Sequence, residues 1–139
     1  MELPVELTEN LIERGVILHS DIFPDIDHGK FFVVVGVDED FVAGFFFINS
    51  NINRAIWNKQ EQLAMQYPMR KDDYDFLRYD SFLCATNIIT RSRKELSESI
   101  QANRTNVVGH MKQEHMDDVL EMVRNSKLFS KIEKLKFFY

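Results

Sequence analysis

Two apolar runs between Lys30 and Ser50 limit the folds that this chain can adopt. The runs Phe31–Val37 and Phe41–Ile48 are rich in aromatic and β-branched residues, and the acidic triplet Asp38–Asp40 separates them. Each run is too short for a buried helix, so the pattern predicts two antiparallel strands joined by a short acidic turn. Because polar and apolar residues do not alternate along the runs, we expect both faces of this hairpin to be buried.

The composition fits one domain that spans residues 1–139. Hydrophobic residues make up 45% of the chain, which is enough for a sizeable core, and twelve Phe will dominate it. The net charge is −5, but residues 1–42 carry ten acids and two bases, a net of −8. Nucleic-acid binders usually show a basic footprint. The overall charge therefore argues mildly against one, although the later residues leave room for a local basic face.

The same sequence predicts a cytoplasmic protein without a membrane anchor. No apolar run approaches the roughly 18 residues that a membrane span requires. The first residues are acidic and lack the basic start and apolar core of a signal peptide. The single cysteine, Cys84, cannot form an internal disulfide, which favours a reducing compartment. Its apolar neighbours favour a buried packing thiol over a nucleophile.

Further elements follow from spacing and capping signals. We expect a short helix over residues 5–14 and strands over 16–23, 62–67 and 81–89, with Pro68 ending the third. A helix capped by Thr90 or Ser92 runs to about residue 101, and a last short strand covers residues 107–108. The strongest helix is predicted over 113–126, with an apolar stripe of Met116, Val119, Leu120 and Val123.

Strands thus come first and helices later, which favours an α+β fold built around a small antiparallel barrel. The barrel core is expected over residues 15–108. The helix at 113–126 and an apolar, basic tail at 127–139 complete the domain.

Several kinds of catalytic or metal site are not indicated. His110 and His115 lie five residues apart, so they do not share a helix face as zinc-protease ligands do. The chain has no glycine-rich phosphate loop and no nucleophile elbow. The carboxylate pairs Asp72–Asp73 and Asp117–Asp118 are better explained as solvated charge than as acid–base machinery. We therefore expect no metal and no cofactor.

Polar residues instead gather at the open end of the predicted hairpin. His28 and Lys30 precede the first strand, and Asn49, Ser50 and Asn51 follow the second. His28 can exchange a proton near neutral pH, Lys30 supplies a cation, and Ser50 supplies a hydroxyl. These are the groups that cleavage of an RNA phosphodiester needs. The alternative is that these residues only mark the polar rim of the barrel.

Five segments in order form a pattern seen in a known family. Gly15–Leu18 is similar to its opening strand, which leads into an acidic or proline-bearing loop. His28–Val35 is similar to the second strand, which follows Arg-Pro in many members and His in a divergent subgroup. Phe45–Asn51 matches a third strand with a Thr-Ser-Asn exit. Tyr74–Leu83 and Val108–Ser126 are similar to a Ser-ended segment and a closing Gly-then-helix. Over residues 15–126 the chain thus resembles the PemK/MazF-like plasmid-maintenance toxin family.

The resemblance implies a small SH3-like antiparallel barrel that forms a homodimer and binds a partner antitoxin. It also implies metal-independent cleavage of single-stranded RNA. By position, Lys30 or His28 stands where the family has its catalytic Arg, and Ser50 belongs to the Thr-Ser pair, which is Asn-Ser here. Lys offers a point charge where Arg presents a bidentate fork. We expect His28 to be the general acid or base, Lys30 the phosphate cation and Ser50 a hydrogen-bond donor.

The predicted RNA-binding residues are Asn49, Asn51, Arg54, Lys59, Arg70 and Lys71. Two other functions remain open. The chain could be an inactive SH3-like barrel that serves as a protein-binding or dimerisation module, or an immunity or regulatory partner. A catalytic site requires His28 and Lys30 to be exposed together, whereas a binding module requires only an apolar groove.

Overall fold

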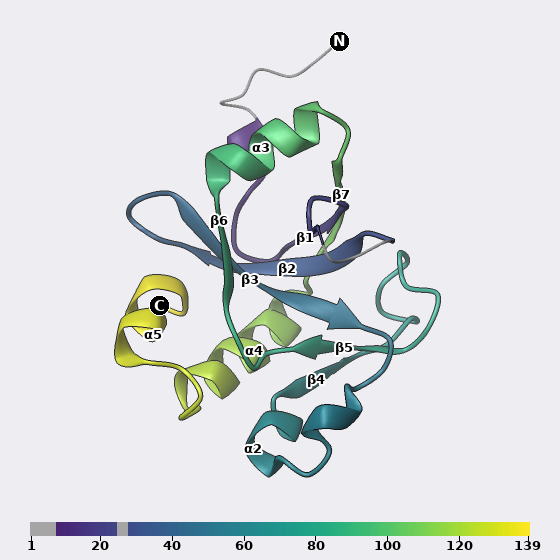
Figure 1. Ribbon diagram of the computed structural model, residues 1–139, viewed down its shortest axis with the longest axis vertical. Coiled ribbons are helices and arrows are strands. Elements are labelled where there is room, and N and C mark those ends of the chain that lie inside the picture. Colours follow the sequence, from purple (N-terminus) through teal and green to yellow (C-terminus); the bar gives the residue numbers. More distant parts are fainter. Residues whose placement is uncertain (1–7, 25–27) are drawn as a thin grey trace.

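The computed structural model describes residues 8–24 and 28–139, and it shows a mixed α+β fold (Figure 1). The parts of the predictions that fall on residues 5–7 and 25–27 lie outside the described residues. The strands are β1 (Val16–Ser20), β2 (Lys30–Val37), β3 (Val42–Asn49), β4 (Gln66–Met69), β5 (Ser81–Cys84), β6 (Ile89–Ser92) and β7 (Thr105–His110). The helices are the 3-10 helix η1 (Arg54–Ile56), α2 (Gln60–Leu63), α3 (Arg93–Gln101), α4 (Gln113–Arg124) and α5 (Lys131–Phe137).

The described strands form one antiparallel sheet that is open, with β4 and β7 at its two ends. Its order is β4-β5-β3-β2-β1-β7. The strand β3 pairs with β2 along one edge, and its other edge is divided between two partners. Residues 42–45 pair with β6, and residues 48–49 pair with β5. The two ends of β3 therefore pair with different strands. As a result, β5 lies beside residues 48–49, at the open end of the hairpin.

The predicted hairpin is confirmed. The strands β2 and β3 pair antiparallel from Phe31–Ile48 to Val37–Ala43, with one irregularity between Val34 and Gly36. The Asp38 carboxylate closes the turn because it accepts hydrogen bonds from the backbone N–H groups of Asp40 (2.9 Å) and Val42 (3.0 Å).

Both faces of the hairpin are buried, as its continuous apolar pattern predicts. Val33 and Phe46 belong to a core cluster shared with α4 and the C-terminal segment. Phe32 and Phe45 belong to a second cluster that includes Leu96 of α3. Figure 1 shows α3 on one side of the hairpin and α4 and α5 on the other. Successive strand residues thus alternate between two cores rather than between a core and water.

The C-terminal tail packs on the sheet through α5, a helix that the sequence pattern did not predict. Phe129, Phe137 and Phe138 are buried in the first core cluster. Arg14 fastens the end of this segment: its Nε donates to the Val35 carbonyl (2.7 Å) and its Nη2 donates to the Phe137 carbonyl (3.1 Å).

Two predicted strands differ from the structure. The strand expected over 62–67 is wrong in its first half, because α2 extends to Leu63 and β4 begins only at Gln66. Pro68 lies inside β4 rather than after it. The strand β4 ends the sheet, so a residue without an N–H costs no ladder bond on the free edge. The segment expected as one strand over 81–89 is divided into β5 and β6, since the two pair with opposite ends of β3.

The remaining boundaries shift modestly. The strand expected over 16–23 ends at Ser20, β7 covers six residues rather than two, and α4 ends at Arg124. Ser92, not Thr90, caps α3 by accepting a hydrogen bond from the Glu95 N–H (3.0 Å). Across residues 8–24 and 28–139, no helix has the length and apolar character needed to cross a membrane.

Candidate functional site

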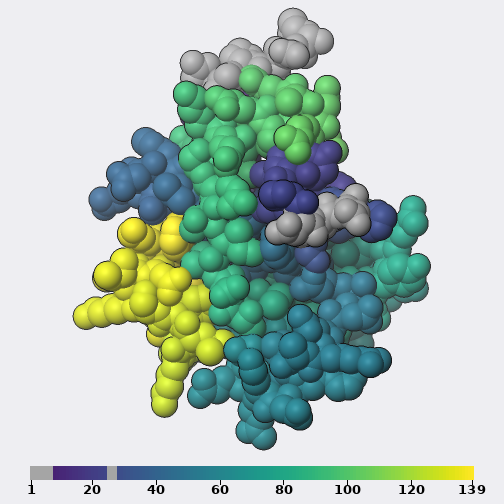
Figure 2. Space-filling view, viewed as in Figure 1, coloured from purple at the N-terminus to yellow at the C-terminus, as the bar shows by residue number. Residues whose placement is uncertain are grey.

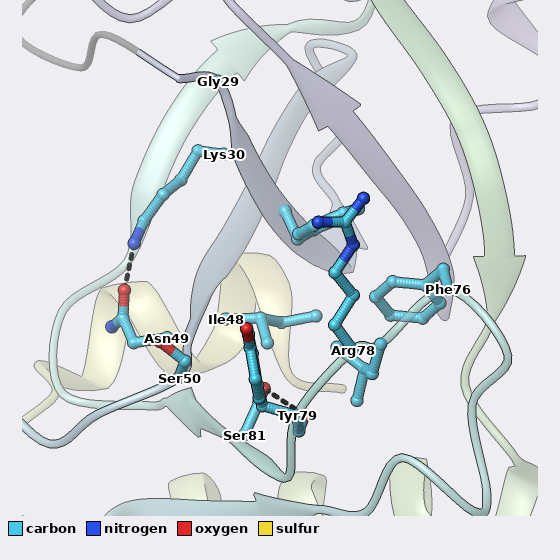
Figure 3. A pocket seen from close by; sticks show the side chains of 11 residues that line it. Gly29, Lys30, Ile48, Asn49, Ser50, Phe76, Arg78, Tyr79 and Ser81 are labelled. Carbon is cyan, nitrogen blue, oxygen red and sulfur yellow. Dashed lines mark hydrogen bonds between the residues drawn. The ribbon is translucent and has the colours of Figure 1, made fainter.

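A pocket of about 310 Å³ opens where the hairpin strands end (Figure 3). Residues 29–31 form one wall and residues 48–50 the wall beside it. The loop of residues 70–80, which connects β4 to β5, supplies the opposite wall through residues 76–79. Because antiparallel pairing places the start of β2 beside the end of β3, the sequence correctly predicts that these two polar ends meet.

Lys30 and Asn49 are the central polar pair of this pocket. The Lys30 ammonium donates a hydrogen bond to the Asn49 side-chain oxygen and lies 5.5 Å from the centre of the Phe47 ring. Burial lowers the pKa of Lys30 below that of a free lysine, and the nearby Cys84 opposes this shift. A lysine with a lowered pKa gives up a proton more readily than an exposed one.

Ser50 and His28 occupy different positions relative to the pocket. Ser50 is exposed and lines it, next to Asn49. His28 is also exposed, but it does not line the pocket, although the adjacent Gly29 does. The structure therefore brings Lys30 and Ser50 together and leaves His28 at the margin. Asn51 is exposed just after the pocket wall.

Another imidazole, which sequence reasoning did not single out, packs under this margin. The ring centroids of His19 and Phe31 lie 4.5 Å apart. Gly29 has a φ of +71°, and a Cβ there would lie 2.8 Å from the His19 Cε1 atom. The strand β1 thus places His19 against the wall of the pocket, and a side chain at position 29 would disturb this contact.

The loop over residues 70–80 supplies the pocket residues that sequence reasoning missed. Phe76 contacts the Phe31 ring with their centroids 5.0 Å apart. Arg78 and Tyr79 are exposed, and Tyr79 is 68% exposed. Figure 3 shows Lys30 and Asn49 meeting at one end of the pocket, with Phe76 and Arg78 coming from the loop. The run of aromatic and basic residues from Phe76 to Tyr79 was the available signal.

Buried and backbone contacts hold this loop in place. The buried Tyr74 accepts a hydrogen bond from the Lys112 N–H (3.1 Å), and its hydroxyl lies 2.7 Å from the His115 Nδ1. The Asp80 carboxylate accepts from the Lys71 N–H (2.9 Å). The Ser81 hydroxyl donates to the Tyr79 carbonyl (2.9 Å). The loop is therefore anchored at both ends and in its middle.

The four basic residues predicted to bind RNA lie outside the pocket lining, in two places. Arg70 and Lys71 are exposed directly after β4, at the start of the pocket loop. Arg54 and Lys59 are exposed on the segment that holds η1 and precedes α2. The Arg54 guanidinium lies 5.7 Å from the Trp57 ring, which is 56% exposed. This second place thus presents an aromatic face beside a cation.

Cys84 is half-buried in β5 rather than fully buried as predicted. Its sulfur accepts a hydrogen bond from the Gln66 side-chain amide at 3.4 Å. Within the described ranges, no three His, Cys, Asp or Glu side chains are grouped so that they could hold a metal ion.

A scan against models of known protein families gives no match, and a search of curated proteins gives no significant one.

Proposed function

We propose that this protein is an endoribonuclease of the PemK/MazF-like toxin type that cleaves single-stranded RNA. The observation that carries the proposal is the composition of one open pocket. Lys30, Ser50 and Arg78 come from three segments of the chain and line it together with the aromatic Phe76 and Tyr79. Cations that bind phosphate and aromatic rings that stack on bases are the two components of sites for single-stranded nucleic acid.

The fold supports the same proposal. We infer that the open, seven-stranded sheet is a form of the family's small SH3-like barrel. The strand β1, the long central hairpin and the closing helix α4 follow the order of the resemblance.

The pocket residues have complementary chemical roles in this proposal. A base takes the proton of the ribose 2′-OH, whose oxygen attacks the adjacent phosphorus, and the 5′-oxygen leaves after it is protonated. Lys30 stabilises the phosphorane charge and, with its lowered pKa, is suited to protonate the leaving oxygen. Ser50 donates a hydrogen bond to a phosphate oxygen, and Arg78 supplies a second cation. His28 is retained as the general base because it is exposed beside the pocket residue Gly29.

The proposed partners follow from the family. A toxin of this type acts as a homodimer in the cytoplasm, and a cognate antitoxin covers its RNA site. The exposed basic side chains of Arg54, Lys59, Arg70 and Lys71 bind further phosphates of the RNA beyond the pocket in this proposal.

The experiment is incubation of the purified protein with a labelled pool of single-stranded RNA in EDTA. The variants are Lys30→Met, Ser50→Ala and His28→Ala, with Lys94→Met as the control because Lys94 is exposed on α3. We expect fragments with 2′,3′-cyclic phosphate ends from the parent protein and from the control. Folded Lys30→Met should give at least a hundredfold less product, the loss typical for one catalytic proton carrier. Cleavage that survives both Lys30→Met and His28→Ala would refute the assignment of the site.

A protein-binding module is the second candidate, and one observation favours it. Phe31, Ile48, Phe76 and Leu77 make much of the pocket wall apolar, which suits a peptide side chain as well as a base. If well-folded protein neither binds nor cleaves RNA across a broad pool, this function is the better explanation.

A further inference from the structure

Trp57 is the single tryptophan of the chain, and it lies on the surface. The residue is 56% exposed, although tryptophan is highly buried on average in folded proteins. Its indole N–H donates to the Ile52 carbonyl (3.4 Å), and the Arg54 guanidinium lies 5.7 Å from the ring centre. Because both partners lie within five residues of Trp57 in the chain, the ring is positioned by its own segment.

The segment that carries Trp57 lies outside both core clusters. Neither η1 nor α2 contains a buried residue, and no residue from 50 to 63 belongs to either cluster. Figure 2 shows the surface of this segment (blue-teal) at the lower end of the molecule. Core packing therefore does not account for a tryptophan at this position, and its surroundings indicate what it could bind.

The residues around this ring favour a nucleic acid. Arg54 and Lys59 are exposed cations, and Glu61 is the single acid in residues 50–65. The amide of Asn58 is exposed as well. Cations bind phosphates, rings stack on bases, and amides hydrogen-bond to base edges. A protein interface instead centres its tryptophan in a pocket whose surroundings exclude water, and these polar, exposed neighbours do not form one.

The same segment continues the wall of the Lys30 pocket. Ser50 lines that pocket, and Trp57 follows seven residues later in the chain. Even fully extended, seven residues span at most about 25 Å, and the turn of η1 shortens this path. Small β-barrel domains bind roughly 4–16 nucleotides of a single strand. One RNA strand of such a length can therefore place a phosphate at Lys30 and a base at Trp57.

We propose that Trp57 is a second subsite for single-stranded RNA, where a base stacks on the ring face opposite Arg54. Arg54 and Lys59 then bind the phosphates that flank this base. The inference rests on the proposed function for the identity of the ligand, and it adds a position outside the pocket. The pocket holds the nucleotides at the cleaved bond, whereas Trp57 holds a base further along the strand. Trp57 thereby raises the affinity for longer RNA without taking part in the cleavage step.

Because the chain has a single tryptophan, tryptophan fluorescence reports on this position alone. The probes are mixed-sequence 2′-O-methyl oligoribonucleotides, which lack the attacking 2′-OH and so are not cleaved. Oligomers of about eight nucleotides should quench the fluorescence, whereas dinucleotides, which are too short to leave the pocket, should not. Inorganic polyphosphate should not quench it either, because this probe carries the charge of a phosphate chain without bases.

Substitutions then measure the contribution of the ring to affinity. Trp57→Ala should bind the labelled oligomer about tenfold more weakly in fluorescence anisotropy, and Trp57→Phe should restore most of the loss because phenylalanine also stacks. Tyr139→Ala is the matched control, since Tyr139 is exposed and Arg124 lies 4.8 Å from its ring centre. The urea midpoint of Trp57→Ala should equal that of the parent chain, because η1 and α2 bury no residue.

Equal quenching by polyphosphate and by the oligomer, or equal affinities of Trp57→Ala and Tyr139→Ala, would overturn the subsite. A fluorescence signal that no RNA changes would also overturn it and leave the ring to a protein partner. Cleavage of unmodified RNA, measured in parallel, keeps these outcomes distinct from that of the proposed function. A parent chain that binds RNA at Trp57 but cleaves none would refute the ribonuclease and keep the subsite, and cleavage without a response at Trp57 would do the reverse.

Discussion

Gly36 in β2 pairs with Gly44 in β3, and Phe137 occupies the space that their missing side chains leave. A Cβ at Gly36 would overlap the Phe137 carbonyl, and a Cβ at Gly44 would lie 2.7 Å from the Phe137 Cδ1 atom. The obstacle at Gly36 is backbone, which cannot move aside as a flexible side chain can. The glycine pair therefore leaves the space in which the C-terminal segment packs on the sheet.

The substitution Gly36→Ala should weaken the packing of the C-terminal segment on the sheet. We expect a loss of about 1–3 kcal/mol in the free energy of unfolding, the usual cost of overpacking a core. Proteolysis should also become faster after residue 127. Urea unfolding and mass spectrometry of limited digests measure the two effects.

Gly109→Ala is the matched control within another strand. The nearest atom to a Cβ at Gly109 is the Phe76 Cδ1 at 3.6 Å, which is an ordinary contact. Alanine there should be neutral or slightly stabilising, because glycine loses more backbone freedom on folding. Equal losses of unfolding free energy at Gly36 and Gly109 would show that the close packing of Phe137 on Gly36 is not the cause.

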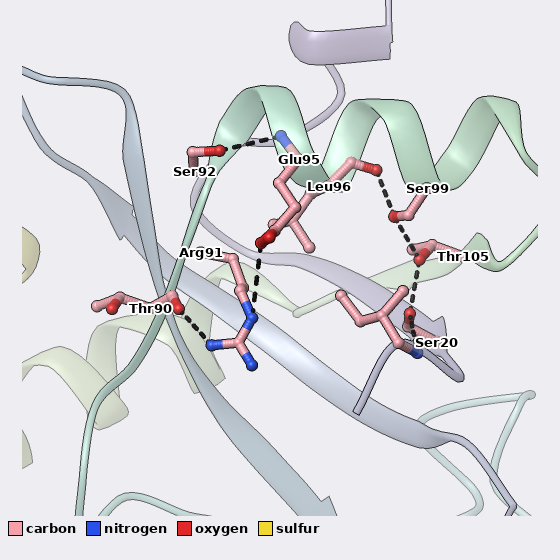
Figure 4. Close-up of polar contacts among 9 residues, drawn as sticks. Ser20, Thr90, Arg91, Ser92, Glu95, Leu96, Ser99 and Thr105 are labelled. Carbon is pink, nitrogen blue, oxygen red and sulfur yellow. Dashed lines mark hydrogen bonds and ion pairs between the residues drawn. The ribbon is translucent and has the colours of Figure 1, made fainter. Parts of the chain in front are cut away.

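A chain of buried hydroxyl groups joins α3, β7 and β1 (Figure 4). Thr105 lies at its centre, with its Oγ1 2.6 Å from the Ser20 hydroxyl and 2.7 Å from the Ser99 hydroxyl. Thr105→Val keeps the shape and leaves Ser20 without this partner, so we expect a loss of about 1–3 kcal/mol in unfolding free energy. Thr90→Val, at an exposed position, should change stability by less than about 0.5 kcal/mol. Equal effects of the two substitutions would contradict a structural role for the hydroxyl chain.

The central hairpin and the meeting of Lys30 with Asn49 could be predicted because they depend on local pattern. Run length, residue type and the adjacency of antiparallel ends determine both. The position of Arg78 could not be predicted in this way. It depends on the loop being held by the contact between Tyr74 and His115, 41 residues apart in the chain. Only the folded chain brings these two side chains together.

The helix α5 could not be predicted from the sequence for a related reason. Large apolar residues lie on both its buried and its exposed side, and charged residues lie between them, so the sequence shows no clear polar face. What selects the buried side is the space over Gly36 and Gly44, which belongs to a hairpin about ninety residues earlier. The division of residues 81–92 into β5 and β6 likewise depends on which end of β3 each one reaches.

The alkaline stability of the protein should depend on Tyr67. Its hydroxyl donates to the Asp118 carboxylate (2.9 Å), and burial together with Asp118 raises the pKa of Tyr67 above its usual value. Above about pH 10 the unfolded chain loses this proton before the folded chain does, so the free energy of unfolding falls as the pH rises. Urea midpoints between about pH 9 and pH 11 measure the slope.

The slope should be shallower in Tyr67→Phe, whatever the change in absolute stability. Tyr79→Phe is the control, because Tyr79 is exposed. If Tyr67→Phe and the parent chain lose stability with the same slope, the raised pKa of Tyr67 does not contribute to folding.

Arg78 and Tyr79 should contribute to RNA affinity in two different ways that salt can separate. A cation on a phosphate releases counterions, so Arg78→Ala should reduce the slope of log affinity against log salt by about 0.7 for single strands. A ring stacked on a base releases none, so Tyr79→Ala should cost about 1–3 kcal/mol without changing the slope. Fluorescence anisotropy with a labelled oligoribonucleotide over a series of salt concentrations measures both, and Lys94→Ala on α3 serves as the control. If neither substitution weakens binding more than the control does, the loop is not part of the RNA site. A peptide held by the apolar wall of Phe31 and Ile48 is then the better explanation of the pocket.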